Sequence, residues 1–148
     1  MVPWMKKHTT FILIIILVLG GTVGPYRLTV NASASSAGLS DPDTTYWVSP
    51  DGEAAWMSCN GALPLNGPSA CALSTANTNA VAGDTVYLRG GTYANQEIRP
   101  SNSGTSDGDR IVYTSYNQEN VTIRDSAYGI YLYKKSYITV NGITFYNL

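Results

Sequence analysis

The sequence TVYLRGGTY at residues 85–93 begins the part of the chain that decides the fold. Apolar and polar residues alternate up to the glycine pair at 90–91, which is the pattern of a half-buried β-strand followed by a turn. One similar run precedes it at 46–48, and others follow at 111–114, 121–124, 129–133, 137–140 and 143–146. Short β runs at regular intervals predict an all-β protein.

The spacing of these runs favours stacked repeats over a β-sandwich. Val86, Ile111 and Ile138 begin comparable strands at steps of 25 (111 − 86) and 27 (138 − 111) residues. Ile98 and Ile123 are also 25 residues apart (123 − 98). A period of about 20–50 residues is typical of solenoids. We therefore predict a right-handed parallel β-helix, of which this sequence holds the first coils, about three in number.

Alternation along each run also assigns the two faces of the strands. The residues predicted to point into the core are Val86, Leu88, Ile111, Tyr113, Ile123, Ile130, Leu132, Ile138, Val140, Ile143 and Phe145. Those predicted to face solvent are Tyr87, Arg89, Thr114, Arg124, Tyr131, Tyr133, Thr139, Thr144 and Tyr146. Residues 72–82 are expected to form a short helix, because Leu73, Ala76 and Ala80 are spaced for one helical face.

The first 34 residues have the pattern of a signal peptide. Lys6, Lys7 and His8 precede the apolar run 11–19, and a small-residue cleavage pattern follows at 32–34. A spanning helix needs about 20 apolar residues, so an uncleaved anchor or a buried core segment is the weaker interpretation. We predict a signal peptide at 1–34, a flexible leader at 35–45 and a secreted, extracellular or cell-surface mature part at 46–148.

The charge of the mature part limits the partners it could bind. Removal of residues 1–34 takes away three of the nine basic side chains and leaves all ten acidic ones, so the net charge becomes 6 − 10 = −4. Nucleic acids and anionic membranes call for basic patches, which argues against both as partners. Neutral glycans are compatible with such a surface, whereas a polyanionic substrate would need a local basic groove or a bridging cation.

The two cysteines, Cys59 and Cys71, both lie in the mature part. An even pair this close in an oxidising compartment predicts a disulfide, with two buried free thiols as the alternative. Closure of a loop of this size would stabilise the fold by about 3 kcal/mol. A metal-binding or catalytic thiol is disfavoured, because the only histidine, His8, lies in the predicted signal peptide.

Four neighbouring residues are candidates for substrate binding. Lys134 and Lys135 are the one adjacent basic pair of the mature sequence, and Tyr131 and Tyr133 precede them at outward positions. Aromatic rings can stack on sugar rings, and lysine can pair with a negative charge on a substrate. The alternatives are ordinary strand packing for the tyrosines and solvated turn charges for the lysines.

Acidic residues suggest a cation site only weakly. Asp107, Asp109 and Asp125 could each supply oxygen ligands to Ca²⁺, but a turn-forming role in the loop 101–109 explains the first two more simply. We therefore assign no metal ligand and no catalytic residue in this chain, and expect calcium only as a cofactor of a longer protein. Asn120 lies in an N-x-T sequon and is a glycosylation candidate.

Two stretches of the sequence resemble a known family. They are AGDTVYLRGGTYANQEIRPSNSGTSDGDRIVYTSYNQENVTI at 82–123 and SYITVNGITFYNL at 136–148. Both are similar to the N-terminal region of right-handed β-helix polysaccharide lyases, in the chondroitinase B and alginate lyase group, with pectate lyases next. The resemblance implies that the helix at 72–82 caps the first coil and shields its strand edges.

The resemblance also implies a chemistry. Such lyases cleave uronate-containing polysaccharide by β-elimination: a cation or positive group neutralises the carboxylate, a Lys or Arg removes the C5 proton, and the glycosidic oxygen leaves. None of the family's catalytic positions matches a residue here, so we expect the 148-residue chain to lack a complete active site and to be a truncated part of a secreted enzyme. A non-catalytic extracellular β-helix for glycan binding or surface structure is the alternative. We further expect self-association through the open last coil if the chain ends there.

Overall fold

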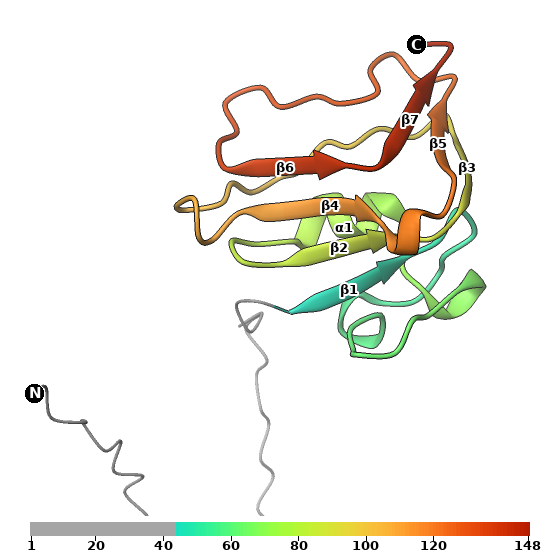
Figure 1. Ribbon diagram of the computed structural model, residues 1–148, viewed down its shortest axis with the longest axis horizontal. Coiled ribbons are helices and arrows are strands. Elements are labelled where there is room, and N and C mark those ends of the chain that lie inside the picture. The colour runs from blue at the N-terminus through green and yellow to red at the C-terminus, as the bar shows by residue number, and fades with distance from the viewer. Residues whose placement is uncertain (1–43) are drawn as a thin grey trace, which may run out of the picture. The chain divides into compact units, whose positions relative to one another are not determined.

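The computed structural model describes residues 44–148, which form two parallel β-sheets with a short helix beside them (Figure 1). The elements in chain order are β1 (Thr45–Val48), three-residue 3₁₀ turns at Trp56–Ser58 and Gly67–Ser69, α1 (Leu73–Asn79), β2 (Thr85–Leu88), β3 (Gly91–Ala94), β4 (Ile111–Ser115), a 3₁₀ turn at Tyr116–Gln118, β5 (Val121–Arg124), β6 (Ile138–Asn141) and β7 (Ile143–Tyr146). The predicted signal peptide at 1–34 and most of the leader lie outside the described residues.

Every strand pairing within the two sheets is parallel. One sheet has four strands in the order β1-β2-β4-β6, and the other has three in the order β3-β5-β7. Tyr113 of β4 pairs with Val86 of β2 on one side and with Val140 of β6 on the other. Ile123 of β5 lies between Tyr93 of β3 and Phe145 of β7 in the same way. Apolar side chains therefore stack on apolar side chains across each sheet.

The core lies between the two sheets and α1. Five of the predicted inward residues are completely buried: Val86, Leu88, Ile111, Tyr113 and Ile123. Four others, Ile138, Val140, Ile143 and Phe145, are half-buried and pack against this cluster from the last two strands. Helix α1 contributes Leu73 and Ala76, both completely buried. Burial of a side chain of the size of leucine or isoleucine stabilises a fold by roughly 1.5–3 kcal/mol, so this cluster is the main source of stability.

The prediction of an all-β, right-handed parallel β-helix is wrong. About 31% of the residues are in strands and about 15% are helical, and the strands make two short parallel sheets of a small α/β-type fold rather than a solenoid. A parallel pair of strands needs a crossover connection of about a dozen residues or more. Spacings of 25 and 27 residues between paired strands meet this requirement as well as they fit a repeat, so they could not identify a solenoid.

Two strand assignments also differ from the sequence prediction. Residues 129–133 form no strand, and only an isolated bridge joins Ile130 to Ile98. Ile130 and Leu132 are accordingly 37% and 36% exposed rather than in the core. In contrast, β3 begins at Gly91, where the glycine pair suggested a turn alone. Gly91 has a φ of 141°, which glycine adopts freely, and it lets the chain enter a strand that pairs with β5.

The predicted disulfide between Cys59 and Cys71 is confirmed. Their Cα atoms are 5.6 Å apart, and both residues are completely buried. Both cysteines also bind the outer side of β1: the Trp47 N–H donates to the Cys59 carbonyl at 2.9 Å, and the Cys71 N–H donates to the Trp47 carbonyl at 2.9 Å. The segment closed by the disulfide therefore satisfies backbone groups at an edge of the four-stranded sheet.

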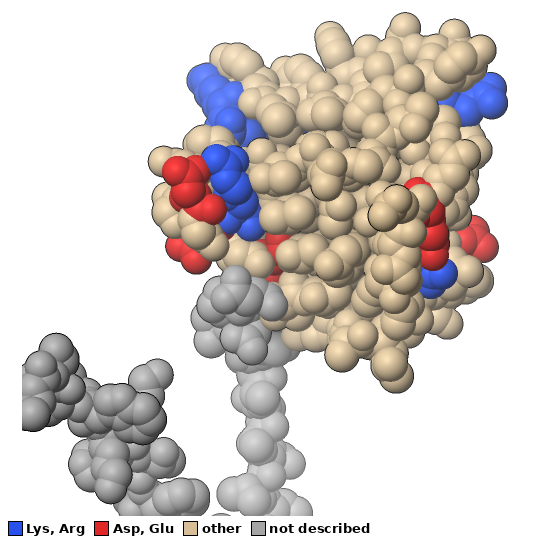
Figure 2. Space-filling model, in the orientation of Figure 1, with Lys and Arg blue, Asp and Glu red and all other residues tan. Residues whose placement is uncertain are grey.

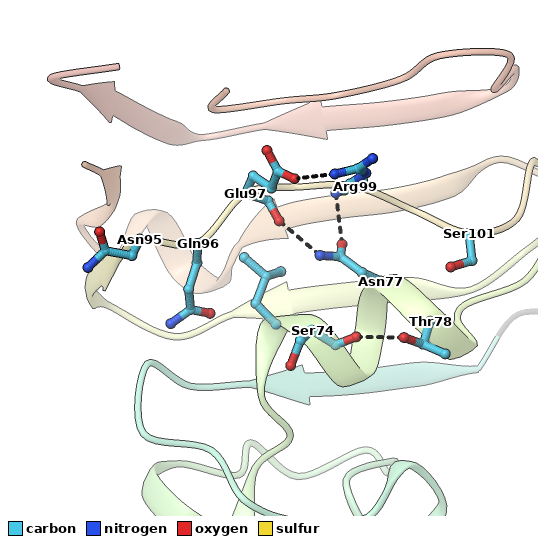
Figure 3. A pocket seen from close by; sticks show the side chains of 9 residues that line it. Ser74, Asn77, Thr78, Asn95, Gln96, Glu97, Arg99 and Ser101 are labelled. Carbon is cyan, nitrogen blue, oxygen red and sulfur yellow. Dashed lines mark hydrogen bonds and ion pairs between the residues drawn. The ribbon is translucent and has the colours of Figure 1, made fainter. Parts of the chain in front are cut away.

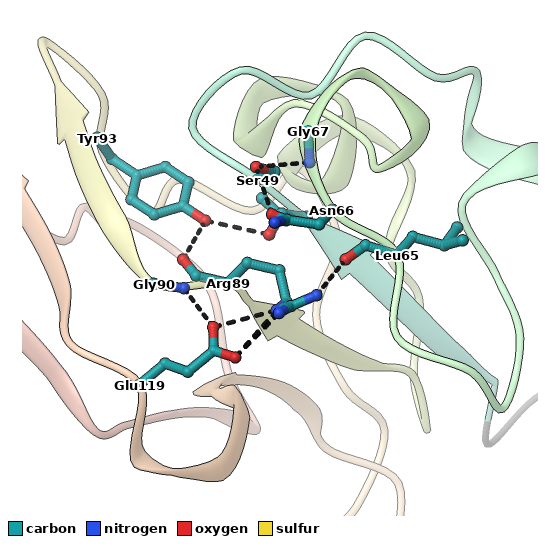
Figure 4. Close-up of polar contacts among 9 residues, drawn as sticks. Ser49, Leu65, Asn66, Gly67, Arg89, Gly90, Tyr93 and Glu119 are labelled. Atoms are coloured by element: carbon teal, nitrogen blue, oxygen red, sulfur yellow. Dashed lines mark hydrogen bonds and ion pairs between the residues drawn. The ribbon is translucent and has the colours of Figure 1, made fainter.

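A polar network around Arg89 joins the end of β2 to two loops (Figure 4). The guanidinium group donates to both carboxylate oxygens of Glu119, at 3.0–3.2 Å, and to the Leu65 carbonyl at 2.8 Å. The Gly90 N–H donates to the same carboxylate at 2.6 Å. Hydrogen bonds from Arg89 and from the Gly90 N–H lower the pKa of Glu119, so its charged form stabilises this turn.

The hydroxyl of Tyr93 lies next to this network. Its oxygen lies 2.9 Å from the Arg89 carbonyl oxygen and 3.1 Å from the Val48 carbonyl oxygen, and the hydroxyl can donate its single proton to either of them. The ring is completely buried, and burial raises the pKa of the phenol. Tyr93 is therefore a neutral donor that ties the three-stranded sheet to the ends of β1 and β2.

Candidate functional site

The backbone of residues 97–101 is held between α1 and the segment 129–131. The Asn77 side-chain amide of α1 donates to the Glu97 carbonyl at 2.8 Å and accepts from the Arg99 N–H at 3.1 Å (Figure 3). On the other side, the Ile98 N–H donates to the Gly129 carbonyl at 3.0 Å. Two independent elements therefore fix the position of the short segment that carries Arg99.

The Arg99 side chain extends from this segment toward Tyr131. Its guanidinium carbon lies 4.5 Å from the centre of the Tyr131 ring, which is the range of a cation–π contact. Its Nη1 atom lies 3.1 Å from a carboxylate oxygen of Glu97, and 59% of the side chain remains exposed. The guanidinium group is thus oriented by two neighbours and still has N–H groups available to a ligand.

Tyrosine rings continue from Arg99 along the surface. Tyr128 and Tyr131 have ring centres 5.2 Å apart, and Tyr131 and Tyr133 have ring centres 6.4 Å apart. The Tyr133 side chain is 64% exposed, whereas Tyr131 is half-buried. The Lys134 ammonium group lies 5.2 Å from the centre of the Tyr133 ring.

A cavity of about 390 Å³ opens beside these rings, and we call it the aromatic cavity. It is lined by Arg99, Pro100, Ser101, Tyr131, Tyr133 and Lys135. Three of the four predicted substrate-binding residues, Tyr131, Tyr133 and Lys135, thus line this cavity. The fourth, Lys134, lies against the Tyr133 ring but does not line the cavity. The Lys135 ammonium group donates to the Ser101 carbonyl, which holds this second cation in the cavity.

A second cavity of about 330 Å³ lies next to the first, and we call it the polar cavity. It shares Arg99 and Ser101 with the aromatic cavity, and its other lining residues include Glu97, Asn95 and Gln96. Figure 3 shows these side chains along the segment that passes over α1. Glu97 lines the polar cavity only, so the two cavities differ in charge: the aromatic cavity has two cations, and the polar cavity has one cation and one carboxylate.

The other tyrosines considered from the sequence lie elsewhere. Tyr87 stacks on Trp47 at 5.1 Å between ring centres, and Tyr116 packs edge-on against Trp47 at 4.9 Å. This cluster lies on the four-stranded sheet. The face of the molecule seen in Figure 2 has few charged side chains at its centre, and the charged side chains lie toward its two sides. Tyr146 is exposed, with the Arg124 guanidinium 6.0 Å from its ring centre.

The three aspartates considered as calcium ligands do not come together. Asp107 pairs with Arg110, and Asp109 accepts from the hydroxyl groups of Thr105 and Ser106 at 3.2 and 2.9 Å. Asp125 pairs with Arg124 and accepts from the Asn147 amide at 2.6 Å. Within residues 44–148, no group of three acidic, histidine or cysteine side chains could hold a metal ion.

Sequence reasoning did not find Arg99, Ser101 or Asn77. The spacing of Ile98 and Ile123 predicted that Ile98 lies in the core. The available signal for Arg99 was its place directly after this isoleucine, where alternation directs a side chain outward. No signal marked Asn77, because its role depends on the packing of α1 against a segment 20 residues away.

In residues 44–148, no helix is long and apolar enough to span a bilayer. The disulfide is compatible with an extracellular location. Comparison of the chain with protein-family models, curated proteins and solved structures finds no significant match.

Proposed function

We propose that this chain is part of a secreted protein that acts on uronate-containing polysaccharide, and that it binds the polymer at the aromatic cavity. The observation that supports this proposal best is the position of Arg99, whose guanidinium group lies 4.5 Å from the Tyr131 ring centre and lines the same cavity as Lys135. Guanidinium groups bind carboxylates through two parallel hydrogen bonds, and a second cation nearby strengthens the attraction.

Each side chain has a distinct task in this proposal. Tyr131 orients Arg99, and the exposed Tyr133 ring offers an apolar surface for the C–H groups of a sugar. Arg99 and Lys135 pair with the uronate carboxylate, and the Ser101 hydroxyl is available to a sugar hydroxyl. A volume of about 390 Å³ is in the usual range for a small-ligand site.

Cleavage by β-elimination is the activity implied by the resemblance to polysaccharide lyases. A non-catalytic glycan-binding protein is the alternative, and both require the same recognition of the polymer. We expect this chain to bind without cleaving, because no residue matches the family's proton-abstracting position. Incubation with polygalacturonate, alginate or chondroitin would test this expectation, and the absorbance of an unsaturated uronate product would contradict it.

Binding is tested by calorimetric titration with polygalacturonate, with uncharged dextran as the control polymer. We expect Arg99→Gln to weaken binding of the acidic polymer by about tenfold, since a charge-assisted contact is lost. Tyr133→Ala should weaken it as well. Higher salt should reduce the affinity of the wild type more than that of Arg99→Gln.

The chain contains a matched control for both substitutions. Like Arg99, Arg124 pairs with a neighbouring carboxylate and lies over a tyrosine ring, that of Tyr146. Tyr146 is 64% exposed, as Tyr133 is, and neither Arg124 nor Tyr146 lines the aromatic cavity. Arg124→Gln and Tyr146→Ala should therefore leave the affinity unchanged. Equal losses in the two pairs of variants would indicate nonspecific attraction and would refute the proposed site.

A further inference from the structure

The polar cavity lies where the next sugar of a bound polymer would sit. It meets the aromatic cavity at Arg99 and Ser101, which line both. The shared residues place the two cavities next to each other on the surface. A chain of sugars bound at the aromatic cavity can therefore continue across Arg99 into the polar cavity.

The polar cavity is suited to hydroxyl groups rather than to stacking. Its lining contains no aromatic side chain. The side-chain amides of Asn95 and Gln96 make no hydrogen bond within residues 44–148, and both residues line the cavity. In Figure 3 the Asn95 side chain points away from the other labelled side chains. An amide offers two donor hydrogens and an acceptor oxygen, which match the mixed donors and acceptors of a sugar.

Glu97 gives the polar cavity a charge preference. Its carboxylate lies 3.1 Å from the Arg99 guanidinium and occupies part of the hydrogen-bonding capacity on this side. A uronate placed in the polar cavity would meet this carboxylate as well as Arg99, whereas a uronate in the aromatic cavity would meet Arg99 and Lys135 and no carboxylate among the lining residues. Repulsion between like charges therefore opposes two acidic sugars side by side and permits an acidic sugar next to an uncharged one.

We infer that the two cavities form a pair of subsites for a polysaccharide in which a uronate adjoins an uncharged sugar, with the uronate at the aromatic cavity and the uncharged sugar at the polar cavity. This inference rests on the proposed function and adds the sugar pattern of the ligand. Glu97 is a specificity residue in it, and Gln96 is a binding residue.

The test compares two polymers at equal ionic strength. Hyaluronan alternates a uronate with an uncharged N-acetylated sugar, and polygalacturonate has a uronate at every position. We expect wild-type protein to bind hyaluronan oligosaccharides more tightly than polygalacturonate oligosaccharides of the same length, by about fivefold per pair of subsites. Glu97→Gln should bring the two affinities together by strengthening the binding of polygalacturonate. Gln96→Ala should weaken hyaluronan binding alone.

Glu53→Gln is the matched control, because Glu53 is exposed and lines neither cavity. It should leave the ratio of the two affinities unchanged. If both polymers bind through Arg99 but Glu97→Gln leaves their ratio as in the wild type, the pattern of subsites is refuted and the proposed function stands. If neither polymer binds, the proposed function is refuted and this inference with it.

Discussion

Removal of the disulfide should destabilise the fold by a predictable amount. The double variant Cys59→Ala/Cys71→Ala opens a loop with a sequence separation of 12 residues. In the chain-entropy model, a cross-link over a loop of this length stabilises the native state by about 3 kcal/mol. The buried positions of both cysteines mean that alanine also leaves unfilled space, so this figure is a lower bound for the double variant.

The loss should be visible in both thermal and chemical unfolding. For a domain of about 100 residues, a change of 3 kcal/mol lowers the midpoint of thermal unfolding by roughly 12 °C or more. Circular dichroism melts and urea titrations of the oxidised wild type and the double variant give the two midpoints. Reduction of the wild-type disulfide should produce a loss of the same order without any change of sequence.

Two exposed residues near the disulfide provide a control for the substitutions themselves. Met57 and Leu63 are 62% and 79% exposed, so Met57→Ala/Leu63→Ala changes two residues near the disulfide without opening it. The free energy of unfolding of this control should lie within about 0.5 kcal/mol of the wild-type value. If the free energy of unfolding of the double cysteine variant also stays within about 1 kcal/mol of the wild-type value, the stabilisation of about 3 kcal/mol expected from loop closure is refuted.

Three further outcomes are expected. Tyr93→Phe should cost about 1–2 kcal/mol in urea unfolding, because two carbonyls lose a buried donor, whereas Tyr133→Phe at an exposed ring should cost nothing measurable. The folded-state pKa of Glu119 is lowered, so its contribution to stability is fully present above the pKa of about 4.5 in the unfolded chain and is lost as the pH falls through the folded-state pKa. The difference in the free energy of unfolding between wild type and Glu119→Gln should therefore shrink as the pH falls below about 4.5. A difference that stays constant with pH would contradict this assignment. Strands β6 and β7 each have a neighbour on one side only within the described residues, so sedimentation should detect self-association that increases with concentration, and a monomer at every concentration would rule it out.

Local alternation in the sequence located five of the ten buried strand residues. Val86 and Leu88 are separated by one residue and both are buried, and Ile111 and Tyr113 repeat this pattern in the neighbouring strand. Such a signal is strong because one face of each strand packs into the core. Alternation was misleading at 129–133, where the chain makes an isolated bridge and then turns at Lys134, which has a φ of 56°.

The fold class and the site depend on contacts that a sequence pattern does not encode. The intervals between strands fit any parallel connection of sufficient length, so the class prediction failed while several strand positions were right. The grouping of Tyr131, Tyr133 and Lys135 followed from their closeness in sequence. The addition of Arg99 required α1 and the segment 129–131 to hold residues 97–99 between them, which is a tertiary arrangement.

The backbone bonds of Cys59 and Cys71 to Trp47 have a consequence for assembly. They occupy the outer side of β1, so the four-stranded sheet offers a free strand edge only at β6 within the described residues. A molecule with one such edge can join a second copy through a two-fold axis, edge to edge, and the pair then has no free edge in this sheet. Assembly through this sheet should therefore stop at a closed dimer and should not extend into a filament.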